Sequence, residues 1–157
     1  MLIRILSCAL LLALSPVLQA QTKPRIEKAA DLPRFTYKLD AKAEDVVRSR
    51  ERFAPFGAAL RKDVESVLAG YDIADKQTQR DLLGQLAALD FLDGQYDRAI
   101  ERSEQIRALQ DKPADKLLSG LRLRAMARAA KAHGVGNEAY ARAVGEAMAK
   151  DIAPMPR

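Results

Sequence analysis

Apolar residues recur at intervals of three and four positions from about residue 41 to residue 152. This spacing places them on one face of an α-helix. Glycine and proline interrupt the pattern where helices are expected to end or begin. The pattern predicts an all-α fold in which short turns join antiparallel helical hairpins, with about six helices at 43–53, 55–70, 75–92, 96–109, 113–133 and 137–150.

Residues 1–20 have a different pattern, with an apolar run over 5–14 after a single basic residue, Arg4. Pro16 and the small residue Ala20 follow this run, as in a secretory signal peptide cut after Ala20. A membrane anchor would need roughly 20 apolar residues, about twice the length of this run. We therefore expect a cleaved signal peptide and export to the periplasm or the cell exterior.

The segment 21–40 lacks helical periodicity and contains Pro24 and Pro33. Within it, residues 35–39 alternate apolar and polar side chains, which is the period of a β-strand. Because no second strand is apparent, we expect an extended arm laid on the helices. The helical domain then covers 41–152, and 153–157 forms a proline-containing tail.

Composition narrows the chemistry further. Cys8, the only cysteine, lies in the expected signal peptide, so the mature chain would have neither a disulfide nor a cysteine-based zinc site. The net charge of +5 falls to +4 once Arg4 is removed. This mild excess is spread among acidic residues, which does not favour nucleic-acid binding. We expect no cofactor.

His133 is the only histidine, and a general base or a metal site needs partners that one histidine does not supply. It lies at an expected helix end, where it favours interaction with the last carbonyl groups. The glycines at 134 and 136 follow no strand, so they indicate a helix break rather than a phosphate loop. We predict no catalytic residue, no metal ligand and no enzymatic activity.

The stretch 80–113 places large and small residues at characteristic positions of two helices and their turn: Leu83, Leu86, Ala87, Gly94, Tyr96 and Ala99. This set resembles the 34-residue tetratricopeptide unit, in which small residues let two helices cross closely. The resemblance implies a hairpin that binds or scaffolds partners. Asp90 and Ser103 depart from it, because bulky apolar residues are usual there.

A second copy of this unit is less clear. Six residues fit the same template more loosely, and Gly134 stands 40 positions after Gly94 rather than 34: Leu123, Met126, Ala127, Ala130, Gly134 and Ala139. Alanine-rich amphipathic helices also match such templates by chance. Both a true repeat and a merely related hairpin stay open.

Four runs carry a second resemblance: 31–35 (DLPRF), 68–76 (LAGYDIADK), 114–121 (ADKLLSGL) and 151–156 (DIAPMP). Together they resemble the helical region ahead of the catalytic domain in exported subtilisin-like serine peptidases of Gram-negative bacteria. This implies an N-terminal piece or a truncated relative. The catalytic motifs of that family do not occur in these residues, so no catalytic residue is carried over.

Two charged residues lie on otherwise apolar faces. Asp90 shares a helix face with Leu83 and Leu86, and Arg122 lies within the apolar arc of the expected fifth helix. A buried lone charge costs several kcal/mol. We predict either that Asp90 and Arg122 pair between helices or that each reaches water separately.

The opposite face of the fifth helix carries Arg124, Arg128 and Lys131. We expect a solvated helix side there, which could also hold an acidic partner segment or acidic lipid head groups. Two classes of function then remain. One is an exported interaction or scaffold module that binds a protein or peptide. The other is an accessory or pro-region whose partner is a subtilisin-like peptidase domain.

Overall fold

A computed structural model describes residues 23–35, 51 and 54–153. The described chain is mostly helical, which confirms the all-α class. Its helices are α3 (Gly57–Gly70), α4 (Lys76–Leu92), α5 (Tyr96–Ala108), α6 (Pro113–Leu118), α7 (Leu121–His133) and α8 (Glu138–Ile152). The expected signal peptide, the helix predicted at 43–53 apart from residue 51, and the last residues of the tail lie outside the described residues.

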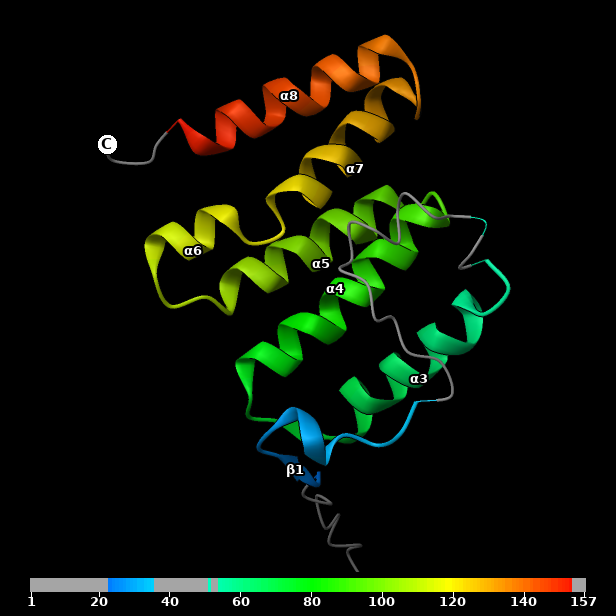
Figure 1. Cartoon of the computed structure of the whole chain (residues 1–157), viewed down its shortest axis with the longest axis vertical. Coiled ribbons are helices and arrows are strands. Elements are labelled where there is room, and N and C mark those ends of the chain that lie inside the picture. The colour runs from blue at the N-terminus through cyan, green and yellow to red at the C-terminus, as the bar shows by residue number, and fades with distance from the viewer. Residues whose placement is uncertain (1–22, 36–50, 52–53, 154–157) are drawn as a thin grey trace, which may run out of the picture.

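The helices follow one another along the long axis of the molecule, from α3 at one end to α8 at the other (Figure 1). α3 packs on α4, α4 on α5, α5 on α7, and α7 on α8. The short helix α6 contacts α5 and α8. Each long helix therefore packs mainly on its neighbours in the stack.

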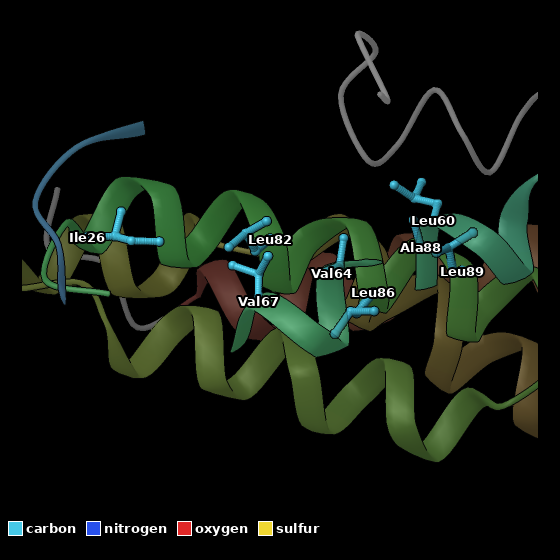
Figure 2. Packing of buried hydrophobic residues seen from close by; sticks show 8 residues of the cluster. All are labelled: Ile26, Leu60, Val64, Val67, Leu82, Leu86, Ala88 and Leu89. Carbon is cyan, nitrogen blue, oxygen red and sulfur yellow. The ribbon is translucent and has the colours of Figure 1, made fainter. Parts of the chain in front are cut away.

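One apolar core joins α3 to α4 (Figure 2). Alternate turns of the two helices contribute leucine, valine and alanine, and one residue from the N-terminal arm completes the cluster: Ile26, Leu60, Val64, Val67, Leu82, Leu86, Ala88 and Leu89. Burying a side chain of the size of leucine contributes about 1.5–3 kcal/mol. This core therefore fixes both α3 and the arm on α4.

A second core joins α4, α5 and α7. Its buried members are four alanines, one leucine and one phenylalanine: Ala87, Phe91, Ala99, Leu123, Ala127 and Ala130. The alanines allow close approach of the helix axes. The rings of Phe91 and Tyr96 pack at the α4–α5 turn, with centroids 5.5 Å apart and planes inclined by 59°.

The N-terminal arm pairs with the α3–α4 connection. β1 (Arg25–Ile26) and β2 (Asp72–Ile73) form a parallel two-stranded sheet with Ile26 opposite Ile73. The backbone amides of Asp72 and Ala74 donate to the carbonyls of Pro24 and Ile26, each at 2.9 Å. A 3-10 turn, η1 (Ala29–Asp31), follows β1.

The arm differs from the sequence expectation. Alternation placed the extended stretch at 35–39, with no partner strand, and residues 36–39 lie outside the described part. The observed strand comes ten residues earlier and has a partner. Both strands have only two residues, too few for alternation to show in the sequence.

The predicted helix 113–133 is also wrong in one respect, because Ser119 and Gly120 divide it into α6 and α7. Gly120 has φ +65°, in the left-handed region that glycine adopts readily. A Cβ at Gly120 would lie 3.3 Å from both the Cβ and the carbonyl oxygen of Ser103 on α5. The break thus lets the backbone of the α6–α7 junction approach α5.

Two predicted helix boundaries are confirmed by hydrogen bonds or backbone conformation. The Asp75 carboxylate accepts from the backbone amides of Gln77 and Thr78 at the start of α4, as an N-cap does. Gly94 has φ +74° in the turn between α4 and α5.

Candidate functional site

The Asp90 carboxylate lies at the centre of a cluster of arginines. The side chain of Asp90 has no exposed surface, and its neighbours on α4 are apolar. Oδ1 accepts a hydrogen bond from Nη1 of Arg61 on α3 at 2.6 Å. The Nε atoms of Arg98 and Arg102 on α5 lie 3.7 and 3.8 Å from its two oxygens. We call these four side chains the Asp90 centre, which ties α4 to both neighbouring helices.

Arg61 is the main partner in this centre. Its Nη2 donates to Asp93 at 2.8 Å, so one guanidinium bridges two carboxylates of α4. Burial alone would lower the pKa of Arg61, but the hydrogen bonds to Asp90 and Asp93 outweigh it and raise the pKa above its ordinary value. Oδ2 of Asp90 accepts no hydrogen bond from the described residues.

The predicted inward position of Asp90 is confirmed, but its predicted partner is wrong. Its ion pairs within the described chain are those with Arg61, Arg98 and Arg102. Arg122 is half-buried on α7, near Tyr140. Burial raises the pKa of Tyr140 above its ordinary value, and the positive charge of Arg122 opposes this rise. A helical wheel gives the direction of a side chain but not which helix stands there, and here α3 and α5 provide the neighbouring cations.

A second buried charge, Arg124, lies between α5, α7 and α8. Its side chain is 2% exposed, and its Nε and Nη2 donate to Oδ2 of Asp151 at 3.1 and 2.9 Å. Nη1 donates to the carbonyl of Ser119 at 3.3 Å, and Nε lies 3.5 Å from Glu104. We call Arg124 and these three partners the Arg124 centre.

The expectation of a solvated basic face is therefore wrong for Arg124, and its neighbours are paired. Arg128 bridges Glu104 and Asp151 at 3.3 and 3.5 Å. Lys131 reaches Asp97 of α5 at 2.5 Å. The wheel showed these cations on one side, but it could not show that α5 and α8 place carboxylates against that side.

Three of the residues that carry the hairpin resemblance lie at or just after the α4–α5 turn. Gly94 occupies the turn itself, Tyr96 begins α5, and Ala99 is fully buried against α4 and α7. Ser103 is buried too, and its hydroxyl donates to the carbonyl of Ala99 at 2.8 Å. The close approach of Gly120 explains why a bulky residue does not fit at 103.

A hollow of about 500 Å³ opens beside the two-stranded sheet. Its wall combines apolar and polar side chains of the arm, α3, β2 and α4: Lys23, Leu68, Tyr71, Asp72, Ile73 and Gln79. Such a volume falls within the range of ligand pockets.

Sequence reasoning missed most of these groups. Arg61, Arg98, Arg102, Glu104 and Asp151 were not singled out. One signal was available, because Arg98 and Arg102 stand four residues apart on α5 and therefore share a helix face. The hollow had no signal, since it depends on the pairing of two strands 47 residues apart.

The chemistry of the described residues is limited in two respects. No group of three or more histidine, cysteine, aspartate or glutamate side chains is arranged there to hold a metal ion. None of the helices in that part of the chain combines the length and apolar character needed to cross a membrane. His133 is exposed at the end of α7, where its carbonyl accepts from the Asn137 side chain.

Comparison of the chain with protein-family models, with curated proteins and with solved structures finds no match.

Proposed function

We propose that the protein is an exported, non-catalytic helical module that binds a protein or peptide partner. In this proposal its helices form antiparallel tetratricopeptide-like hairpins, and the hollow beside the β1–β2 sheet receives an extended segment of the partner. The observation that carries the proposal is this hollow, whose wall combines apolar and polar side chains beside β2.

The strand edge supports an extended peptide as the occupant. Asp72 and Ala74 direct their backbone amides toward β1. The intervening residue, Ile73, therefore directs its backbone groups to the opposite side, as alternate residues of a ladder do. A peptide strand added at an open edge gains affinity from main-chain hydrogen bonds, while pockets beside it select side chains.

The hollow's lining supplies that selection. Leu68, Tyr71 and Ile73 offer apolar contact, whereas Lys23 and Gln79 add polar groups. The Asp72 carboxylate is already paired with Arg25 at 3.2 Å. We expect a peptide with one large apolar side chain and a carboxylate that faces Lys23.

A peptidase-accessory role is the second candidate. Two of the runs that resemble subtilisin-like peptidases, 31–35 and 68–76, pack against one core. Leu32 and Phe35 pack on the same core as Leu68 and Tyr71. If the resemblance holds, the partner segment would belong to a peptidase domain.

Selection of displayed random peptides on the immobilised chain tests the proposal. Peptides retained by the wild type should lose at least about tenfold in affinity for Tyr71→Ala. Tyr140→Ala is the matched control, because Tyr140 is likewise half-buried but lies on α8. Failure to select any peptide, or equal loss in both variants, would refute binding at the hollow.

Export needs its own test. Expression of the full chain in a Gram-negative host, followed by cell fractionation and N-terminal sequencing, should give a periplasmic or extracellular product that begins at Gln21. An unprocessed cytoplasmic product would contradict the export proposal and leave the peptide-binding proposal standing.

A further inference from the structure

The outer half of α8 is not covered by any other described element. Its inner half faces α7 with half-buried side chains: Tyr140, Ala143, Val144, Ala147, Met148, Asp151 and Ile152. Every other residue of the helix is exposed. α8 lies at the end of the stack in Figure 1, so its outer face is turned away from the other labelled helices.

A row of small residues runs along this face. Ala141, Gly145 and Ala149 are spaced by four residues and all are exposed. A Cβ at Gly145 would meet nothing within 4 Å, although glycine within a helix is less stable than alanine. The described chain therefore gives no packing reason for this glycine, whereas close approach of another helix would give one.

A row of charged residues runs beside it. Glu138, Arg142, Glu146 and Lys150 are also spaced by four, are all exposed, and alternate in sign. Arg142 pairs with Glu138 within the helix at 2.9 Å. The row thus presents an ordered pattern of charges on a flat helical face.

Among two-fold symmetric pairings of this helix, the charge pattern is complementary to itself in the antiparallel orientation alone. Against an antiparallel copy, Glu138 faces Lys150 and Arg142 faces Glu146, so all four contacts are attractive. Against a parallel copy in register, each residue faces its own like charge. The antiparallel pairing places the two-fold axis within one residue of Gly145. The midpoint of the small row and the midpoint of the charged row therefore lie at nearly the same position along α8.

We propose that two copies of the chain associate through the outer faces of their α8 helices, antiparallel and with Gly145 at the two-fold axis. The small row lets the helix backbones approach, and the charged row sets the register. A 15-residue helix is about 22 Å long. One helix pair of that length buries less than the roughly 1,200–2,000 Å² of stable complexes. The dimer is therefore weak and dependent on concentration.

This self-association goes beyond the proposed function, because it uses a surface distant from the hollow. It is tested by sedimentation equilibrium of the full chain, purified after export or as produced, from about 1 to 300 μM. We expect a dissociation constant on the order of 10 μM. Strictly monomeric protein over this range would overturn the proposal.

Gly145→Leu tests the contact point. The space around Gly145 is open and leucine is a better helix former, so the monomer keeps its fold while the helices are held apart. We expect dimerisation to weaken at least about tenfold. Ala132→Leu is the control, since Ala132 is an exposed alanine on α7 and should leave the dissociation constant unchanged. A dimer that tolerates Gly145→Leu would place the interface elsewhere and refute the proposal.

A charge swap tests the antiparallel register. Arg142→Glu and Glu146→Arg each introduce two repulsive contacts across the two-fold axis, and each should weaken the dimer about fivefold. The double variant restores opposite charges and should return to within about twofold of the wild type. A double variant weaker than either single one would overturn this register. In all variants, circular dichroism monitors the helix content, and unchanged peptide binding separates the result from that of the hollow.

Discussion

The Asp90 and Arg124 centres both hold a buried charge between helices, but they hold it by different means. Within the described part of the chain, Asp90 receives one hydrogen bond, from Arg61, while Arg98 and Arg102 approach no closer than 3.7 Å. Arg124 instead donates to Asp151 and to the Ser119 carbonyl, with Glu104 as a further carboxylate.

The difference follows from the chemistry of the buried group. A guanidinium has five N–H donors in a rigid fork, so several acceptors can surround it. A carboxylate held among apolar residues depends on how close long arginine side chains can come. The Asp90 centre thus relies on one contact, whereas the Arg124 centre is redundant.

The largest expected effect comes from removing that one contact. Arg61→Met keeps much of the side-chain volume but leaves Asp90 buried without its hydrogen bond, which should lower the free energy of unfolding by roughly 3–5 kcal/mol in urea titration. Asp93→Asn removes the charge of the second carboxylate that Arg61 contacts. Because Asp93 is exposed, this change should lower the free energy of unfolding by under about 0.5 kcal/mol. Equal effects of the two variants would show that Asp90 does not depend on Arg61.

Gly120→Ala tests how far the backbone conformation at the α6–α7 junction stabilises the Arg124 centre. The change would force a left-handed conformation on alanine and bring its Cβ to 3.3 Å from Ser103, next to the Ser119 carbonyl that Arg124 uses. We expect a loss of about 2–3 kcal/mol in unfolding free energy. Gly94→Ala has similar backbone strain without a near neighbour, so it should cost about 1–2 kcal/mol. If Gly94→Ala costs as much, the contact with Ser103 contributes nothing.

Asp151→Asn tests the redundancy directly. Arg124 keeps Glu104 and the Ser119 carbonyl, so the loss should be only about 1 kcal/mol. Glu104→Gln alone should cost a similar amount, but the double variant should lose more than the sum, because Arg124 would then have no carboxylate. An additive double-mutant cycle, measured by denaturant unfolding, would mean that the two carboxylates act independently.

The smallest expected effect concerns acid and lies outside both centres. The Thr78 side-chain hydrogen bond, helped by backbone amides, lowers the pKa of Asp75 below its ordinary value. Its contribution is therefore present above about pH 4 and lost as the pH falls through the lowered pKa.

Asp75→Asn retains a capping oxygen but does not titrate. Its melting temperature should fall less than that of the wild type between pH 6 and pH 3. Parallel melting curves for the two proteins would assign the acid sensitivity to other carboxylates.

Local features of the fold, such as helix ends, turns and buried positions, could be predicted from the sequence. The Asp75 cap and the Gly94 turn follow from local capping signals, and the burial of Ala99 follows from its place in the tetratricopeptide pattern; all three are found. The inward position of Asp90 follows from helical periodicity alone. The break at Gly120 did not, because α6 and α7 each continue the same apolar pattern.

Contacts between residues far apart in the chain could not be predicted from the sequence. Choosing Arg61 rather than Arg122 for Asp90 requires the order of helices around α4. The exposure expected for Arg124 failed because α8 supplies Asp151 from 27 residues away. The pairing of β1 with β2 was not predicted, because the two strands are far apart in the sequence. Each strand also has only two residues, too few to show an alternating pattern.

That strand pairing also sets an order of events in time. Ile26 is 1% exposed, yet its partner strand lies 47 residues later in the chain. During synthesis from the N-terminus, the arm has no place to dock until α3 and residue 74 have followed it. Closure of so long a loop carries an entropic cost that the helices must first offset. We therefore expect the amide protons of Asp72 and Ala74 to gain protection from exchange with solvent only after those of α4, late in folding.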